Sequence, residues 1–218
     1  MRRVLVVSLV LAAMAAGAMA GEPEAIEPEK TIVLFNGKNL DGWTIHVRGK
    51  TDPGKVFWVE DGLLKCAGRP PGYIRTNEAY KNYKFVMEWR FTRPGNSGVL
   101  VHMIGQDRVW PKSLECQGAY KNQGDFWVIG GFEHKEHKAG GKRVGGRRTR
   151  KLGPHNEKKI GEWNTYEIVC KGDTVVPYVN GKKMNEATEC SWTAGRICIQ
   201  SESAVWEARK IVLEPLDK

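Results

Sequence analysis

Apolar side chains recur at every second position along several stretches of the chain, and this period constrains the fold more than any other feature. It is clearest in residues 85–91, 99–104 and 113–117, where one set of alternate positions is apolar. A period of two is that of a β-strand, whose successive side chains point to opposite faces of a sheet. These stretches therefore predict strands with one face toward a core.

If these three strands are neighbours, their second face gathers polar groups. That face would carry Arg90, His102, Glu115 and Gln117. A cation, an imidazole, a carboxylate and an amide are the groups that a sugar site or an acid–base site uses. We therefore expect the candidate site on this face.

Short apolar segments that end at turn residues fill the rest of the chain. Asn-Gly or Asp-Gly pairs stand at 36–37, 61–62 and 180–181, and such pairs favour tight turns between antiparallel strands. Long helical patterns are scarce, so we expect a single all-β domain, an antiparallel jelly-roll β-sandwich. The expected strands are 31–35, 43–47, 56–59, 63–66, 73–76, 83–93, 99–104, 113–118, 125–130, 165–171, 174–179, 196–200 and 207–213.

The first residues have the layout of an export signal. Two arginines precede an apolar run from Val4 to about Ala16, and small residues lead to a cleavage point after Ala20. This run is too short for a retained membrane helix, and no later segment approaches the ~20 apolar residues that spanning requires. We expect a mature chain in the periplasm or outside the cell. The expected parts are a signal peptide at 1–20, a mobile leader at 21–30 and one domain at 31–218.

The positive charge of the chain lies in one segment. The formal net charge is +9, and the mature chain keeps +7 once the two arginines of the signal peptide are removed. Residues 132–160 hold ten Lys or Arg against three Glu, also +7, so the rest of the domain is neutral. This segment is a candidate contact for an acidic polysaccharide or the cell envelope. Nucleic acid is the weakest of the polyanion partners, because the segment lacks interleaved aromatic residues and the chain is exported.

All five cysteines fall in the mature chain, and an odd number leaves at least one thiol unpaired in a monomer. No C-x-x-C spacing exists, which argues against a structural zinc site. One disulfide remains compatible with the sequence, without an assignable pairing.

A series of short motifs, in their order and spacing, resembles a known family. Together they are similar to the secreted domain formerly called DUF1080, now described as 3-keto-disaccharide hydrolase, or 3-keto-glucoside 1,2-lyase and 3-keto-2-hydroxyglucal hydratase. The resemblance runs from about Thr31 to Leu216 and implies a concanavalin A-like jelly roll that acts on oxidised, 3-keto glycosides. The motifs are L-F-N-G-K-N-L-D-G-W (34–43), F-W-V-E-D-G-L-L (57–64), T-N-E-A-Y-K-N-Y-K-F (76–85), E-W-R (88–90), G-N-S-G-V (95–99), S-L-E-C-Q (113–117), G-E-W-N-T-Y-E-I (161–168), V-N-G (179–181), I-C-I-Q (197–200) and E-A-R-K-I-V-L-E-P-L (207–216).

The implied reaction sets three demands on the protein. A ketone at C3 acidifies the C2 hydrogen, so a base can remove it, the C1 substituent leaves by β-elimination, and water adds to the product. A base must reach C2, a cation or donors must hold the enolate oxygen, and an acid must meet the leaving oxygen. Ordinary glycosidases instead need two carboxylates at a set separation, and no paired-carboxylate motif stands out in the sequence.

The base is left open between His102 and Glu115. His102 lies in an apolar strand, where a neutral imidazole accepts a proton, although a hydrogen-bonded core histidine fits equally. Glu115 lies at a strand centre, where a carboxylate needs a partner or a metal. Arg90 would be that partner or would stabilise the enolate, and a structural ion pair is the alternative.

Further residues are candidates for substrate binding. Gln117 suits recognition of hydroxyl groups. Asn96 and Ser97 stand in a turn that they would cap, but at a sheet rim they also suit sugar hydroxyls. Trp110 and Trp127 would stack on a sugar ring, although tryptophan in a sandwich more often belongs to the core.

The sequence assigns no cofactor with certainty and leaves a divalent metal possible. If the family reaction uses a divalent cation, His102 and Glu115 are its expected ligands. The segment 133–138, E-H-K-E-H-K, also carries metal-ligating side chains, but in a lysine-rich loop a solvated role is favoured. The alternative function is a non-catalytic carbohydrate-binding module, because concanavalin-like sandwiches serve that role too. Such a module would show an exposed aromatic platform in place of an acid–base cluster.

Overall fold

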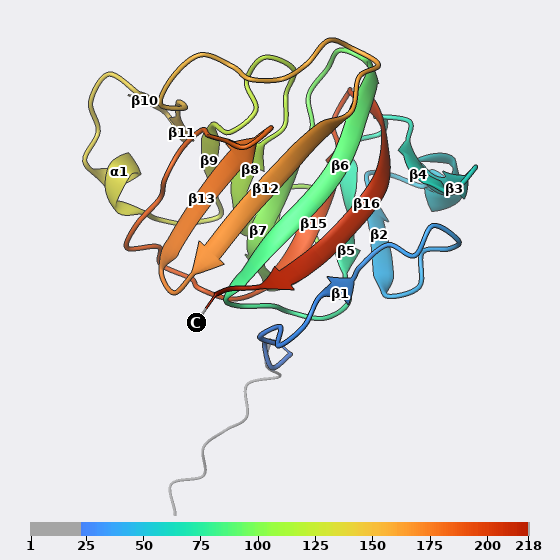
Figure 1. Cartoon of the computed structure of the whole chain (residues 1–218), viewed down its shortest axis with the longest axis horizontal. Helices are drawn as coiled ribbons and strands as arrows, with labels where there is room; N and C mark the ends of the chain where they lie inside the picture. The colour runs from blue at the N-terminus through green and yellow to red at the C-terminus, as the bar shows by residue number, and fades with distance from the viewer. Residues whose placement is uncertain (1–22, 218) are drawn as a thin grey trace, which may run out of the picture.

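Two antiparallel sheets lie face to face in the structure, a computed structural model that describes residues 23–217 (Figure 1). The front sheet, nearest the viewer in Figure 1, has the order β14-β13-β12-β6-β16-β4-β3, with β1 beside β16. The back sheet has the order β10-β11-β9-β8-β7-β15-β5-β2. The predicted all-β, concanavalin A-like jelly-roll sandwich is confirmed.

The strand boundaries follow the alternation closely. The front sheet consists of β1 (Ile32–Val33), β3 (Phe57–Glu60), β4 (Leu63–Cys66), β6 (Tyr83–Arg93), β12 (Asn164–Lys171), β13 (Thr174–Val179), β14 (Lys182–Lys183) and β16 (Val205–Pro215). The back sheet consists of β2 (Trp43–Val47), β5 (Gly72–Thr76), β7 (Gly98–Ile104), β8 (Lys112–Gln117), β9 (Phe126–Ile129), β10 (Val144–Gly145), β11 (Arg148–Thr149) and β15 (Arg196–Ser201). A 3-10 turn (Pro53–Lys55) and a short helix α1 (Lys135–Lys138) complete the elements.

The prediction that residues 85–91, 99–104 and 113–117 are neighbours in one sheet is wrong. β7 pairs with β8 in the back sheet, whereas β6 pairs with β12 and β16 in the front sheet. Residues Pro94 and Gly95 stand between β6 and β7, where the chain passes from one sheet to the other. Alternation specifies which side chains share a face, but it carries no information on which sheet a strand joins.

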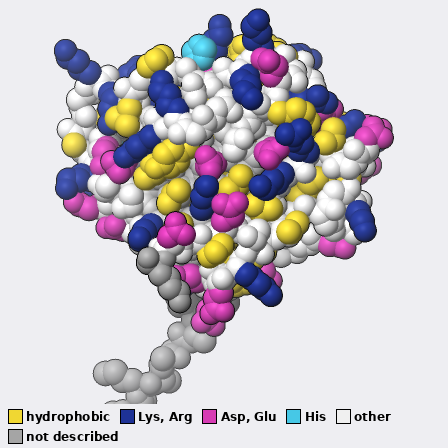
Figure 2. Space-filling model, viewed as in Figure 1, with side chains coloured by type: hydrophobic (Ala, Val, Ile, Leu, Met, Phe, Trp, Pro, Cys, Tyr) yellow, Lys and Arg dark blue, Asp and Glu magenta, His cyan; other side chains and the backbone are white. Residues whose placement is uncertain are grey.

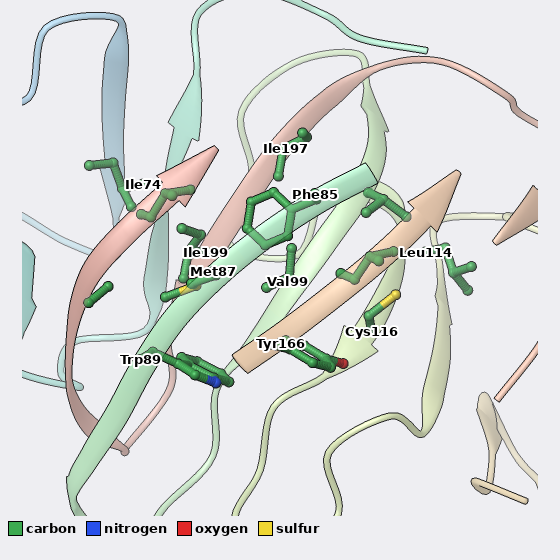
Figure 3. Packing of buried hydrophobic residues seen from close by; sticks show 14 of the residues in the cluster. Ile74, Phe85, Met87, Trp89, Val99, Leu114, Cys116, Tyr166, Ile197 and Ile199 are labelled. Atoms are coloured by element: carbon green, nitrogen blue, oxygen red, sulfur yellow. The ribbon is translucent and has the colours of Figure 1, made fainter. Parts of the chain in front are cut away.

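The core fills the space between the two sheets (Figure 3). Trp89 of β6 is fully buried in this core, with its ring stacked on Tyr166 at a centroid distance of 5.7 Å and an interplanar angle of 4°. Phe91 and Trp206 meet the same indole edge-on, at 4.8 and 6.1 Å. Aromatic pairs in these geometries add about 0.5–1.5 kcal/mol each beyond the area they bury.

The basic segment 132–160 is a folded extension of the back sheet. It contains α1 and the hairpin β10–β11, which pairs with β9 and lies at one side of the sandwich (Figure 1). Several of its cations bind acids of the domain; Arg148 Nε, for example, donates to the buried Asp125 Oδ2 at 2.7 Å. Contact with a polyanion stays a prediction.

The outer face of the front sheet carries both signs of charge (Figure 2). Lys84 binds Glu167 at 2.6 Å, and Arg209 binds Glu88 at 2.6 Å. Cross-strand pairs of this kind satisfy side chains that point away from the core. This face therefore presents a mixed ionic surface.

The predicted signal peptide lies outside the described residues, and so do the first two residues of the leader. Within the described part of the leader, Ile26 N donates to Ala79 O at 2.9 Å, and Lys81 N donates to Ile26 O at 3.0 Å. Among residues 23–217 no helix is long and apolar enough to cross a membrane. All five cysteines are buried free thiols.

The packing around Trp89 leads to a prediction on stability. Replacing this fully buried indole, Trp89→Ala, is expected to lower the free energy of unfolding by about 3–5 kcal/mol, because the cavity left behind cannot close. The matched control is Trp163→Ala, whose ring lies on the outer face with the Arg90 and Arg209 guanidiniums 4.6 Å from its centroid; its loss is expected to be about 1–2 kcal/mol. Urea unfolding measures both, and equal losses would contradict the account.

Candidate active site

A cavity of about 220 Å³ opens on the outer face of the back sheet. It joins residues from β8 and β9, from the two loops that flank β7, from the residue after β15 and from the β10–β11 turn. Five of the predicted site residues line it, and three further lining residues were not predicted. The lining residues are Asn96, Trp110, Glu115, Gln117, Trp127, Ile129, Arg147 and Glu202.

Glu115 lies in the wall of this cavity and is 5% exposed. It stands in β8 opposite Leu100 of β7 and Trp127 of β9. Its Oε1 atom, like Oε1 of the adjacent Gln200, is buried without a hydrogen-bond partner among the described residues. A side-chain oxygen left in this state inside a cavity is available to a ligand.

Gly98 makes room for these two side chains. A Cβ atom at this position would lie 2.5 Å from Gln200 Oε1 and 2.8 Å from Glu115 Oε1. Contacts below 3.0 Å do not occur for real Cβ atoms, so any larger residue would displace one of the two groups. The glycine of the N-S-G turn thus shapes the cavity, a role that the turn motif alone does not reveal.

The surroundings of Glu115 in the cavity raise the pKa of its carboxyl group. Burial raises the pKa of its carboxyl group, and the negative charge of Glu202 raises it further, to about 8, while Arg147 acts in the opposite direction. Such a group exchanges a proton readily at physiological pH, which is what a general acid or base requires.

Glu202 is the second carboxylate of the cavity and was missed by sequence reasoning. Asn96 Nδ2 donates to its Oε2 at 2.7 Å, and Trp110 Nε1 donates to its Oε1 at 3.2 Å. Burial raises its pKa too. The alternation of side chains could have revealed Glu202. It continues the set of alternate positions formed by Cys198 and Gln200, which are both buried in β15.

Two tryptophans border the cavity. Trp110 is 45% exposed and is stacked against Arg48, whose Cζ lies 5.0 Å from the ring centroid. Trp127 belongs to β9, and Arg147 Cζ lies 5.9 Å from its ring centroid. Amphipathic indole rings of this kind suit the apolar faces of a sugar while their edges contact polar groups. Both predicted aromatic residues are therefore at the site.

Hydrogen bonds to Asp107 hold the loop that carries Trp110 in place. Arg75 Nε and Nη2 donate to Asp107 Oδ1 and Oδ2 at 2.8 and 2.9 Å, and Tyr73 OH donates to Oδ1 at 2.9 Å. Two parallel guanidinium bonds give a bidentate pair of defined geometry. The residues that follow Asp107 are thereby held over the back sheet.

Gln117 is oriented by the backbone. Its Oε1 accepts hydrogen bonds from the N–H groups of Gly118 and Ala119, both at 2.9 Å. The amide Nε2 is not used in these two bonds, and hydroxyl recognition by Gln117 stays a prediction. Ser97 differs: its Oγ donates to Gln200 O at 2.9 Å and it is fully buried. It therefore joins the turn before β7 to β15 and does not line the cavity.

The prediction that Arg90 belongs to the site is wrong. Its guanidinium binds Glu207 on the outer face of the front sheet, at 2.7 Å, and lies over Trp163. The cause is the placement of β6 in the front sheet. Arg90 is the structural ion pair that the sequence left as the alternative.

His102 does not join Glu115 either. The ladders of β7 to both neighbours shift register around this residue, and His102 has a φ of +54°, the geometry of a bulge. The bulge reverses the alternation, so that the ring points into the core, edge-on to Tyr83 at 6.5 Å. The alternation predicted the opposite face.

No metal is supported by this arrangement. His102 and Glu115, the ligands expected for a divalent cation, lie on opposite faces of the back sheet. Within residues 23–217 no group of three or more His, Cys, Asp or Glu side chains is placed to hold a metal. In the 133–138 segment His134 is buried and caps α1, and Glu136 accepts from Thr188 Oγ1 at 2.7 Å, so these two side chains are structural and not solvated.

Fold and cavity together define a concanavalin-like sandwich with two carboxylates and two tryptophans on one sheet face. Residues 30–214 match the family model of the 3-keto-alpha-glucoside-1,2-lyase-like domain, and the chain belongs to this family.

Individual relatives extend this comparison. A 3-keto-disaccharide hydrolase of Bacteroides thetaiotaomicron is 26% identical over 178 residues, which cover 74% of this chain and 59% of that protein. The chain thus spans little more than half the length of this curated relative. A Parabacteroides distasonis protein assigned as a glycosyl hydrolase superposes with a TM-score of 0.63 at 24% identity, covering 86% of this chain and all of that one.

The fold also occurs in proteins of other roles. The carbohydrate-binding module CBM66 of Bacillus subtilis has a TM-score of 0.56 at 11% identity, covering 79% of this chain and 95% of the module. A β-glucanase of Bacillus licheniformis has a TM-score of 0.58 at 13% identity, covering 88% and 100%. At these identities the likeness concerns the fold alone.

The position of His102 generates a prediction on acid stability. Burial lowers the pKa of its ring to about 4 in the fold, against about 6.5 in an unfolded chain. The unfolded state therefore binds a proton first as pH falls, and the folded state loses stability between about pH 6.5 and pH 4. In urea unfolding at about pH 7 and pH 4.5, wild type is expected to lose about 2–3 kcal/mol more than His102→Gln. The same loss in both proteins would refute this assignment.

Proposed function

We propose that this chain is an exported carbohydrate-active enzyme that cleaves 3-keto-glycosides by removal of the C2 proton, β-elimination and hydration. The observation that carries the proposal is Glu115, a buried carboxyl group with a pKa of about 8 in a cavity between two tryptophans. A carbon acid beside a ketone needs a base whose pKa lies near the working pH. Family membership supplies the substrate class.

Glu115 is the base of this reaction. Its ionised carboxylate removes the proton from C2, and the electron pair of the C–H bond forms an enolate with the C3 ketone. The C1–O bond then breaks, and its electron pair leaves on the aglycone oxygen. Glu115 returns the proton to this oxygen, so the elimination is balanced in charge and in protons. Water adds across the C1=C2 bond of the product to give the free 3-keto sugar.

The remaining groups bind the ring. Trp110 and Trp127 offer aromatic surfaces on two sides of the cavity, and Gln117 Nε2 donates to a hydroxyl group. Asn96 donates its amide Nδ2 to Glu202 at 2.7 Å, and its Oδ1, buried without a partner among the described residues, is left to accept from a hydroxyl group. Glu202 accepts hydrogen bonds from Asn96 and Trp110, and its negative charge raises the pKa of Glu115.

Ordinary glycoside hydrolysis is the second candidate, and one observation favours it. The structure brings two carboxyl groups, Glu115 and Glu202, into one cavity, and paired carboxylates are the machinery of classical glycosidases. Elimination is preferred because Glu202 already accepts hydrogen bonds at both oxygens, which restrains it as a nucleophile or as the base for a water molecule.

The fold likeness to CBM66 keeps a binding module as the third candidate. A module needs an exposed aromatic platform, and Trp110 is exposed. A buried carboxyl group with one unpartnered oxygen has no use in a platform, and its desolvation costs stability. The site therefore favours catalysis over binding alone.

The central prediction concerns Glu115→Gln, which keeps the shape of the side chain and removes the base. Turnover of 3-keto-trehalose or an aryl 3-keto-glucoside is expected to fall by about 10²–10⁴-fold. Product formation followed by NMR in D2O should give deuterium at C2 with wild type. The matched control is Glu167→Gln on the front sheet, which should retain wild-type turnover.

Each other outcome selects a different function. Turnover without deuterium at C2 would favour ordinary hydrolysis, and sugar binding without any turnover would favour the module. Undiminished turnover in Glu115→Gln would refute the assigned base.

The pH dependence follows from the same carboxyl group. Only ionised Glu115 removes a proton, so kcat/KM is expected to rise with pH and to level off above about pH 8. Initial rates across the pH range measure this limb. A rate that falls through the same range would mean that Glu115 acts as an acid and would contradict its role as the base.

A further inference from the structure

We propose that Arg147, carried into the cavity by the β10–β11 turn, is a catalytic residue that holds the C3 enolate oxygen during elimination. This inference rests on the proposed function and assigns the cation that the reaction requires. The sequence led us to expect Arg90 in this role, but Arg90 lies on the opposite sheet. Arg147 is the one lysine or arginine among the described residues that line the cavity.

The turn that presents Arg147 is anchored on the site itself. Val128 N donates to Arg147 O at 3.0 Å, and the next residue, Arg148, pairs in register with Trp127 of β9. The preceding Gly146 has a φ of +57°, a conformation that favours glycine and completes the tight turn. Because β9 also borders β8, the turn is fixed at two strands' distance from Glu115.

The neighbouring cations of the segment are engaged elsewhere, which sets Arg147 apart. Arg148 and Lys151 bind Asp125, and Arg143 Nη1 donates to Asn185 Oδ1 at 3.0 Å. Within residues 23–217 no carboxylate lies within salt-bridge distance of Arg147. Its guanidinium lies over Trp127 instead, 5.9 Å from the ring centroid. Arg147 is thus the cation of this segment that lines the cavity without an ion-pair partner among residues 23–217.

The positive charge of Arg147 acts on the carboxyl groups of Glu115 and Glu202, although Arg147 contacts neither. It lowers the pKa of Glu115 and of Glu202 against the effect of burial. Arg147 and Glu115 both line the cavity of about 220 Å³, so a sugar ring bound in this cavity would contact both residues. The C2 hydrogen and the C3 oxygen are on adjacent carbons, so a base and a cation on either side of the ring can reach them together.

The chemistry of the step needs a permanent positive charge. When Glu115 takes the C2 proton, the electron pair moves into the C2–C3 bond and negative charge appears on the C3 oxygen. A guanidinium stays protonated throughout and donates several N–H groups to that oxygen. When the ketone re-forms, the electron pair of the enolate becomes the C1=C2 bond, and the electron pair of the broken C1–O bond leaves on the aglycone oxygen. Arg147 therefore stabilises the enolate, and the ground-state ketone far less.

The test compares Arg147→Met and Arg147→Lys with the matched control Arg150→Met, an exposed arginine of the same segment whose Nη1 binds only Lys142 O. With an aryl 3-keto-glucoside, Arg147→Met is expected to lower kcat by about 10²–10³-fold, with KM changed only a few-fold and the unfolding temperature unchanged. Exchange of the C2 hydrogen in D2O should slow by the same factor. Arg147→Lys and added guanidinium chloride should each restore part of the rate.

A second readout is the pH profile. Loss of the nearby cation raises the pKa of Glu115, so the limb of the kcat/KM profile should move to higher pH in Arg147→Met and stay in place in Arg150→Met. Wild-type kcat and an unmoved limb in Arg147→Met, with an active wild type, would overturn the role of Arg147 alone. A wild type that turns over no 3-keto sugar would overturn the proposed function, and the role of Arg147 with it.

Discussion

The main physical constraint on this structure is the burial of one carboxyl group away from water. Glu115 is buried on a sheet face with no counter-ion in contact, and a carboxylate in that position is unstable unless it takes up a proton or meets a partner. The fold provides neither in full. Gly98 leaves room beside the group, Gln200 lies against it, and Arg147 acts from a distance. The result is a carboxyl group whose pKa is raised to about 8, so that it gains and loses a proton near neutral pH.

This constraint explains why the cavity draws on so many separate segments. A single strand places Glu115, but its environment comes from β9, from the residue after β15, from the β10–β11 turn and from the loop that the Arg75–Asp107 pair fixes. The basic segment is part of that environment. Several of its cations bind acids of the domain, and its function at the site is to present Arg147.

The alternation of apolar residues predicted much of the fold and part of the site. It predicted β2, β4, β6 and β13 to the residue, and it placed Glu115 and Gln117 on the face opposite the core. It failed at His102, because a bulge inserts one residue into the period and no local sequence signal marks it. It failed at Arg90 because a period does not say which sheet a strand joins. Arg147 escaped prediction because a turn residue has no period at all.

Family membership and fold leave the chemistry to be decided by the site, since similar sandwiches include a β-glucanase and a carbohydrate-binding module. The most direct test is therefore the titration of Glu115 itself. Carbon-13 NMR of side-chain carboxyl groups, compared between wild type and Glu115→Gln, isolates its signal. One glutamate signal is expected to titrate near pH 8 in wild type and to be absent from the variant. A spectrum in which every glutamate titrates below about pH 5.5 would contradict this expectation.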